Sequence, residues 1–178
     1  MVVAARATID RPSGGMGAPR IPVNVLFVCE DNCALSLMAE SILATLGDGR
    51  FRAYSAGCAP ASAASRRVLD FLARHHMHTG GLHPKVLDTV RREAPPMDFI
   101  ITLCDAAADE SFAAWPGAPF IAHWDVHDDD ADISSEATHR HIFWTLWRRI
   151  KIFASLPSGT LNRRALERRA LTLQASYL

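Results

Sequence analysis

Residues 23–46, VNVLFVCEDNCALSLMAESILATL, decide the fold of this chain. The stretch Val23–Val28 is an apolar run of strand length, interrupted only by Asn24, which is typical of a parallel strand buried on both faces. From Ser36 to Leu46 the apolar residues recur at helical period, and Asn32 and Ser36 are candidates to cap that helix. A buried strand that leads directly into an amphipathic helix indicates the start of a βαβ unit.

The rest of the chain continues this alternation of strands and helices. A short strand is predicted at Phe51–Ser55, a buried strand at Asp98–Leu103, and a fourth strand at Phe120–His123. Helical patterns cover four more segments, namely Ala63–His75, Pro84–Glu93, about Ser135–Leu156 and about Leu161–Ser176. Such alternation predicts right-handed crossovers and a parallel sheet. We therefore expect an α/β fold of three layers, with a four-stranded parallel sheet and helices on both of its faces.

Composition narrows the class of protein. The 178 residues suit one domain, which we place at 21–178, after a loosely held or disordered extension at 1–20. The 19 basic residues equal the 19 acidic ones, which argues against a nucleic acid or a membrane surface as partner. The N-terminus lacks the apolar middle segment of a secretory signal, so we expect a cytoplasmic protein whose four cysteines are reduced.

The loop after the first strand is the candidate site. In an open α/β sheet, ligands bind at the carboxyl ends of the strands, and a helix N-terminus there attracts anions and lowers the pKa of a nearby thiol. We interpret Cys29 as a site residue, although it could be only a small buried residue at a strand end. The anion-binding loop would then comprise Glu30, Asp31, Asn32, Cys33, Ala34, Leu35 and Ser36.

Five motifs in order resemble the low-molecular-weight protein tyrosine phosphatase superfamily, and within it most closely the thioredoxin-coupled arsenate reductases. The family pattern is a strand, then Cys-x5-Arg-Ser, then Met-Ala-Glu, and VLFVC ends here at Cys29 before Ser36-Leu-Met-Ala-Glu40. The remaining likenesses are Ser55-Ala-Gly57, Gly81-Leu-His-Pro-Lys85, Thr102-Leu-Cys104-Asp, and His123-Trp124 followed by Asp128.

The resemblance implies a role for each matching residue. Cys29 matches the nucleophile, Asn32 and Ser36 match the residues that organise the loop, and Asp128 matches the general acid. Cys104 matches the second redox cysteine of the reductases. The resemblance further implies a small oxyanion (phosphate, sulfate or arsenate) or a phosphotyrosine protein as substrate, a thioredoxin-type reductant, and no cofactor. Two alternatives remain open, since Cys104 could be a core thiol and Asp128 could belong to a solvated acidic loop.

The sequence departs from the family pattern at the residues that carry its chemistry. Leu35 stands at the position of the arginine that grips the oxyanion, six residues after Cys29. Glu30 and Asp31 stand where the family usually has Thr and Gly, and their charges oppose an anion. Ser111 replaces the third redox cysteine and Asp129 replaces the Pro after the general acid. A substitute cation would have to come from elsewhere, with Lys85 and Arg52 as candidates.

We therefore favour a non-hydrolytic descendant that uses the pocket for binding or redox sensing. The alternatives are an active tyrosine phosphatase or arsenate reductase with Cys29 as nucleophile, and a non-enzymatic dimer or interaction module. Cys33 and Cys58 are read as packing residues. His123, Asp125 and His127 could suggest a metal, but they lie on a predicted loop, so we predict no metal site.

Trp144 lies off the apolar stripe of its predicted helix. An exposed Trp often marks a contact surface. We therefore expect Trp144 to be partly exposed or buried in a homodimer.

Overall fold

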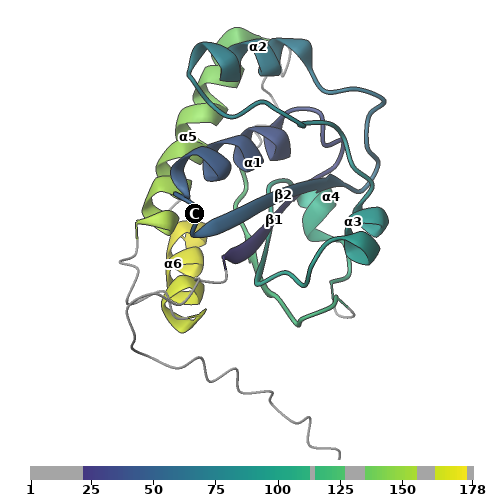
Figure 1. The fold of residues 1–178 in the computed structure, drawn as a ribbon, viewed down its shortest axis with the longest axis vertical. Coiled ribbons are helices and arrows are strands. Elements are labelled where there is room, and N and C mark those ends of the chain that lie inside the picture. The colour runs from purple at the N-terminus through teal and green to yellow at the C-terminus, as the bar shows by residue number, and fades with distance from the viewer. Residues whose placement is uncertain (1–21, 113–114, 127–134, 156–162, 176–178) are drawn as a thin grey trace, which may run out of the picture.

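The computed structural model describes residues 22–112, 115–126, 135–155 and 163–175. Figure 1 shows the arrangement of its strands and helices. In chain order these are β1 (Val23–Cys29), α1 (Leu35–Leu46), β2 (Phe51–Gly57), α2 (Arg66–Arg74), α3 (Leu87–Glu93), β3 (Phe99–Thr102), α4 (Asp105–Ala108), β4 (Phe120–His123), α5 (Glu136–Ala154) and α6 (Arg163–Ala175).

The four strands form one sheet in the order β2-β1-β3-β4, and every pairing is parallel. This confirms the predicted sheet. In the register, Cys29 lies opposite Gly57, Val28 opposite Thr102, and Thr102 opposite His123. The carboxyl ends of all four strands therefore meet at one edge, which is where the first strand delivers Cys29.

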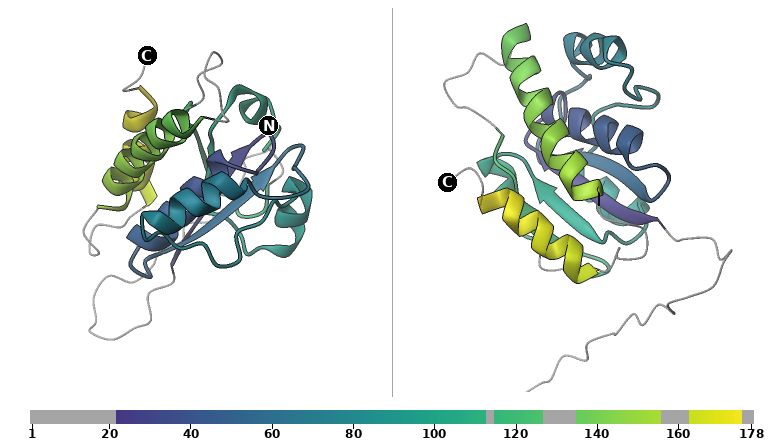
Figure 2. Two further views of the ribbon diagram at one scale, coloured as in Figure 1. Left: turned by 90° about the horizontal axis from the view of Figure 1, so that it is seen from above. Right: turned by 90° about the vertical axis from the view of Figure 1, so that its left-hand side faces the viewer.

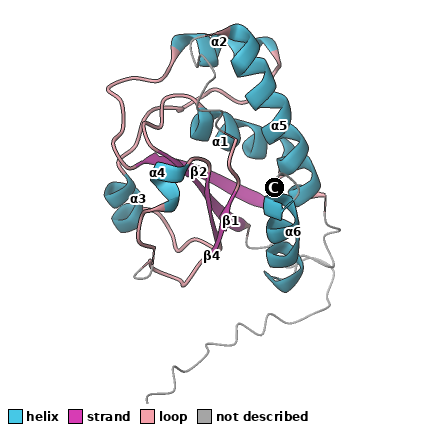
Figure 3. Cartoon of the chain, turned by 180° about the vertical axis from the view of Figure 1, so that it is seen from behind, coloured by secondary structure: helices cyan, strands magenta, loops and turns pink. Residues whose placement is uncertain are grey.

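Helices cover both faces of the sheet, as predicted. One face packs against α1, α2, α5 and α6 in a cluster that includes Phe27, Met38, Phe143 and Phe153. The other face packs against α3 and α4 in a smaller cluster that includes Leu26, Val28, Ile100 and Trp115. Figure 2 and Figure 3 show the two groups of helices on opposite sides of the strands. Both faces of β1 are thus buried, which explains the apolar run Val25–Val28.

The observed bounds differ from the predicted ones mainly beside the candidate site. β2 runs two residues beyond Ser55, to Gly57. α2 begins only at Arg66, because the Ser65 side chain accepts a hydrogen bond from the Val68 amide and caps the helix.

α3 begins at Leu87 rather than at Pro84, because the preceding residues are used for other contacts. The Lys85 amide donates to the Asn32 side chain at 2.7 Å, and Val86 forms an isolated bridge with Gly57. The short helix α4 was not predicted, since four residues are too few for a periodic pattern.

Several predictions fall outside the described residues. These concern the extension at 1–20, the residues His127, Asp128 and Asp129, and the predicted helix ends at Leu156, Leu161 and Ser176. None of the helices in the described ranges is long and apolar enough to cross a membrane.

Candidate anion loop and its cysteines

The loop between β1 and α1 is built around a buried asparagine. α1 begins at Leu35, and its cap residue Ala34 offers no side-chain hydrogen bond, so the prediction that Asn32 or Ser36 caps this helix is wrong. Asn32 instead adopts a left-handed backbone with φ of 48° and is fully buried. Asn tolerates that conformation better than most residues, because its short polar side chain can bond locally.

The side chain of Asn32 holds three segments together. Its amide nitrogen donates to the Ser36 hydroxyl at 2.7 Å and to the Ser55 hydroxyl at 2.9 Å. Its amide oxygen accepts from the Lys85 backbone N–H at 2.7 Å. Asn32 therefore ties the loop to α1, to β2 and to the segment before α3.

A charged pair extends this network away from the loop. Glu40 on α1 accepts from the Ser55 hydroxyl and from Lys85 Nζ, the latter at 3.0 Å. Lys85 Nζ also donates to the His83 carbonyl at 3.0 Å. The ammonium group of Lys85 is thus engaged by Glu40 and its own turn, and it supports the network from behind.

The sulfur of Cys29 lies inside this frame, with 1% of the residue exposed. It lies 2.8 Å from the Ser36 hydroxyl and 3.3 Å from the backbone nitrogen of Asn32, whose N–H donates to it. Burial raises the pKa of the Cys29 thiol to about 11, against the lowering effect of the Ser36 and Asn32 hydrogen bonds, and the Asp31 charge raises it further. The pKa therefore lies above its ordinary value, opposite to the direction expected from the sequence, because burial outweighs the hydrogen bonds of the loop.

The carboxylate of Asp31 occupies the loop. Its Oδ1 accepts the Cys33 backbone N–H at 3.0 Å and lies 3.8 Å from the Cys29 sulfur. Its Oδ2 accepts from the Cys33 thiol at 2.9 Å. Burial and this carboxylate together raise the pKa of Cys33 to about 12. The backbone N–H of Cys33, one of the hydrogen-bond donors of the loop, is thus bound to the carboxylate of Asp31.

Comparison with known proteins identifies the family of this chain. Residues 24–153 match the family model of the low molecular weight phosphotyrosine protein phosphatases. This chain belongs to that family. No curated protein sequence matches it.

Solved structures of two arsenate reductases are similar. The thioredoxin-dependent enzyme of Corynebacterium glutamicum is 26% identical with a TM-score of 0.57, over 73% of this chain and 59% of that one. The enzyme of Archaeoglobus fulgidus is also 26% identical, with a TM-score of 0.59, over 74% of this chain and 99% of that one. The chain therefore spans less than two thirds of the Corynebacterium protein and nearly all of the Archaeoglobus one.

A tyrosine phosphatase shares the fold as well. The low molecular weight protein tyrosine phosphatase of T. tengcongensis is 21% identical with a TM-score of 0.60, over 75% of this chain and 99% of that one. Both activities named among the similar structures thus occur on the architecture described above.

At the position that the resemblance assigns to the arginine of the family, this chain has a core residue. Leu35, which stands there, is 7% exposed and belongs to the main core cluster. Ala34 is also buried, whereas Glu30 is exposed at the mouth of the loop. The side chain at position 35 therefore stabilises the fold and offers no hydrogen bond to a ligand.

The structure places both cations that the sequence suggested as substitutes. Lys85 is paired with Glu40. Arg52 lies opposite Asn24, five residues before Gly57 on β2. Five strand residues span about 17 Å. Arg52 therefore lies toward the amino ends of the strands, whereas Cys29 lies at their carboxyl ends.

Cys58 and Cys104 follow the strands on either side of β1. Cys58 packs against the smaller core cluster and Cys104 against both clusters, and the Cys58 amide donates to the Cys29 carbonyl at 3.2 Å. Burial raises the pKa of Cys104, opposed in part by a hydrogen bond from the Glu30 backbone N–H. Burial raises the pKa of Cys58 to about 12, with further contributions from Glu110 and Cys104.

The sequence interpretation treated Cys58 as structural and missed this neighbourhood. Counting strand positions could have found it, because Cys58 and Cys104 follow strands on either side of β1. Asp128, the implied general acid, lies outside the described residues.

Proposed function

We propose that this chain is a divergent, non-hydrolytic member of the phosphatase family, in which an internal carboxylate takes the place of the substrate anion. The observation that carries the proposal is the position of Asp31. Its two oxygens accept from the amide and the thiol of Cys33, so a donor that a phosphoryl or arsenate group would need is already engaged.

Charge supports the same conclusion. Asp31 and Glu30 place two carboxylates beside a site that an oxyanion must enter. At about 6 Å and an effective dielectric near 20, each would cost about 3 kcal/mol per ligand charge as an upper figure. Leu35 supplies no compensating cation. A Cys29 thiol with a pKa of about 11 is protonated at neutral pH, so the nucleophilic thiolate is scarce.

Hydrolysis of a small aryl phosphate and thioredoxin-coupled reduction of arsenate test the proposal. The wild type should run near background in both assays, with Cys29→Ser as the blank. Turnover that is robust in the wild type and disappears in Cys29→Ser contradicts the proposal. It would favour the alternative of an active phosphatase or reductase that uses Cys29 as nucleophile.

A second test of the proposal restores the residues that the family usually has at positions 30, 31 and 35. The triple variant Glu30→Thr, Asp31→Gly, Leu35→Arg should gain turnover, whereas Leu35→Arg alone should gain little. Because Leu35 lies in the core, an arginine there could impair folding. The double variant Glu30→Thr, Asp31→Gly keeps Leu35, and it should bind inorganic phosphate more tightly than the wild type in calorimetry. Equal phosphate affinity of the two proteins contradicts the role of Asp31.

We further propose that the cysteines of the loop take part in redox chemistry. Cys104 lies against the backbone of Glu30, the residue that follows Cys29. One mild oxidant of the peroxide class would take two electrons and two protons from Cys29 and Cys104, leaving a disulfide and two waters. A thioredoxin-type reductant, which the name of the Corynebacterium relative includes, would restore both thiols. Free thiols of this kind suit the cytoplasm.

An interaction module is the second candidate function. Trp144 on α5 is 46% exposed, as predicted, and its ring contacts those of His75 and Trp147. A homodimer through this surface should dissociate when Trp144 is replaced by Ser, which sedimentation equilibrium measures. A wild type that stays monomeric at all concentrations rules out the dimer.

A further inference from the structure

A cluster of potential metal ligands lies at the carboxyl edge of the sheet beyond the anion loop. It comprises Asp105, the first residue of α4, His123, the last residue of β4, and Asp125. One ligand atom from each lies within 4.8 Å of the others. His123 Nε2 and Asp105 Oδ1 lie 3.5 Å apart. Three segments of the chain thus bring one imidazole and two carboxylates together.

The imidazole is oriented from behind. His123 Nδ1 lies 2.9 Å from the Thr102 hydroxyl, and Thr102 is 1% exposed on the adjacent strand, directly opposite His123. This bond leaves Nε2 directed toward Asp105. A histidine that binds a metal usually has its other ring nitrogen held by a hydrogen bond of this kind, which fixes the ring and its tautomer.

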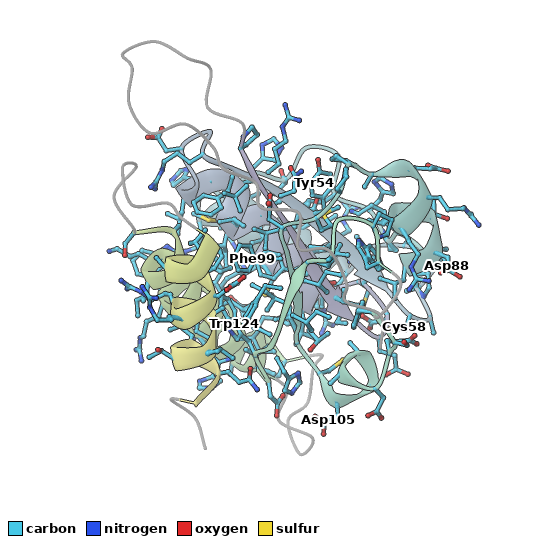
Figure 4. All side chains as sticks on the ribbon, turned by 90° about the horizontal axis from the view of Figure 1, so that it is seen from below. Tyr54, Cys58, Asp88, Phe99, Asp105 and Trp124 are labelled. Atoms are coloured by element: carbon cyan, nitrogen blue, oxygen red, sulfur yellow. The ribbon has the colours of Figure 1, made fainter. Side chains whose placement is uncertain are left out.

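The backbone between the ligands is anchored as well. Trp124, between His123 and Asp125, is completely buried and donates its indole N–H to the Ala170 carbonyl at 3.1 Å. Arg149 donates to the Asp125 carbonyl at 2.8 Å. Figure 4 shows Trp124 inside the molecule beside α6 and Asp105 at its outer margin. The ligand-bearing backbone is therefore held in place while the carboxylates reach the surface.

We propose that Asp105, His123 and Asp125 bind one divalent first-row transition-metal ion, with Mn²⁺ or Fe²⁺ as the best match. Imidazole favours the transition metals and carboxylate favours the harder ions, so a mixed set with open water positions suits these two. The two carboxylates balance the ionic charge. Atoms that share an ion at about 2.1 Å lie at most about 4.2 Å apart, so small rotations of exposed side chains close the site.

The sequence predicted no metal site at this edge of the sheet. That prediction considered His123, Asp125 and His127 along the sequence, where they lie on a loop without a third converging ligand. Asp105 lies 18 residues before His123 in the sequence, and only the parallel pairing of β3 and β4 brings it close.

Titration of the full-length reduced chain with Mn²⁺, without an affinity tag, tests the proposal. Free Mn²⁺ is measured by electron paramagnetic resonance, in a phosphine reductant that does not chelate metals. Mn²⁺ disfavours thiolates, so the four cysteines do not compete. One equivalent should bind to the wild type. Asp105→Asn, Asp125→Asn and His123→Ala should each weaken binding at least tenfold.

Two further variants separate a built site from a general surface effect. His141→Ala removes an exposed histidine on α5 and should leave Mn²⁺ affinity unchanged. Thr102→Val removes only the hydroxyl behind His123 and should weaken binding about tenfold. The 88% exposure of the Asp105 side chain makes Asp105→Asn safe for folding. Binding that does not saturate at one equivalent, or that Asp105→Asn leaves unchanged, overturns the proposal.

Discussion

Replacing Asp31 by Asn removes the charge from the anion loop and keeps its shape. The carboxylate lies 3.8 Å from the Cys29 sulfur and 2.9 Å from the Cys33 sulfur, and it raises the pKa of both thiols. Asn retains an oxygen that can accept the Cys33 amide, so the turn should persist. The substitution therefore isolates the electrostatic effect of Asp31 on the two cysteines.

The size of the effect follows from the distances. Two unit charges separated by 3.8 Å repel by about 1 kcal/mol in a water-like medium and about 4 kcal/mol at an effective dielectric of 20. The lower figure equals roughly one pKa unit and tenfold more thiolate. Nucleophilicity falls as the pKa falls, with a Brønsted slope of about 0.4–0.5, so the net gain in alkylation rate is about threefold. Burial remains, and the pKa of Cys29 should stay above its ordinary value of 9.0.

Pulsed alkylation with iodoacetamide at pH 8, read for each cysteine by peptide mass spectrometry, measures the effect. Cys29 and Cys33 should react about threefold faster in Asp31→Asn. Cys58 serves as the internal reference, because burial and Glu110 dominate its pKa. The mirror variant Glu110→Gln should accelerate Cys58 and leave Cys33 unchanged. An unchanged rate at Cys33, or equal acceleration of all four cysteines, refutes the electrostatic reasoning, the latter because it indicates an opened loop.

Asn32→Ala should lower the free energy of unfolding by about 3 kcal/mol, because it removes two buried hydrogen bonds and one partly buried one, at about 1 kcal/mol each. Asn24→Ala removes one exposed side-chain hydrogen bond and should cost about 1 kcal/mol or less, and equal losses in urea melts would contradict this. The pKa of Cys29 is near 11 in the folded chain, against an ordinary 9.0, so its thiol contributes stability below pH 9 that is lost as the pH rises to 11. Across that range the free energy of unfolding of the wild type should fall by up to about 3 kcal/mol more than that of Cys29→Ser. Parallel pH profiles of the two proteins, measured in reductant, would exclude it. Mild oxidation should yield a Cys29–Cys104 disulfide, with Cα atoms brought within about 7 Å by loop movement; mass spectrometry that finds only Cys29–Cys33, or no bridge, counts against the pair.

The fold was predictable from the sequence because short, mainly apolar segments of strand length alternate with amphipathic helices. Val23–Val28 is apolar on both faces, and the parallel sheet buries both. The bounds failed where residues serve the site instead of a local pattern. Lys85 and Val86 look helical after Pro84, yet they bind Asn32 and Gly57 across the molecule. No periodicity in the sequence carries such a long-range contact.

The site was predictable as a location and less so as a chemical state. The sequence indicates that Leu35 is no arginine, but only packing shows that its side chain belongs to the core. It indicates an acidic loop, but only a rotamer shows that Asp31 binds the Cys33 amide. The pKa of Cys29 was predicted in the wrong direction, since the degree of burial is a property of the assembled fold.

The three hydrogen bonds of Asn32 bear on how relatives of this chain are recognised. Asn32 joins α1, β2 and the segment before α3, and a side chain at Gly57 would meet the Glu30 carbonyl at 2.7 Å and Asn32 Cβ at 3.0 Å. These residues therefore support the fold whether or not the loop is catalytically active. A motif search that scores the whole loop alike detects this shared framework, and it does not by itself report on chemistry.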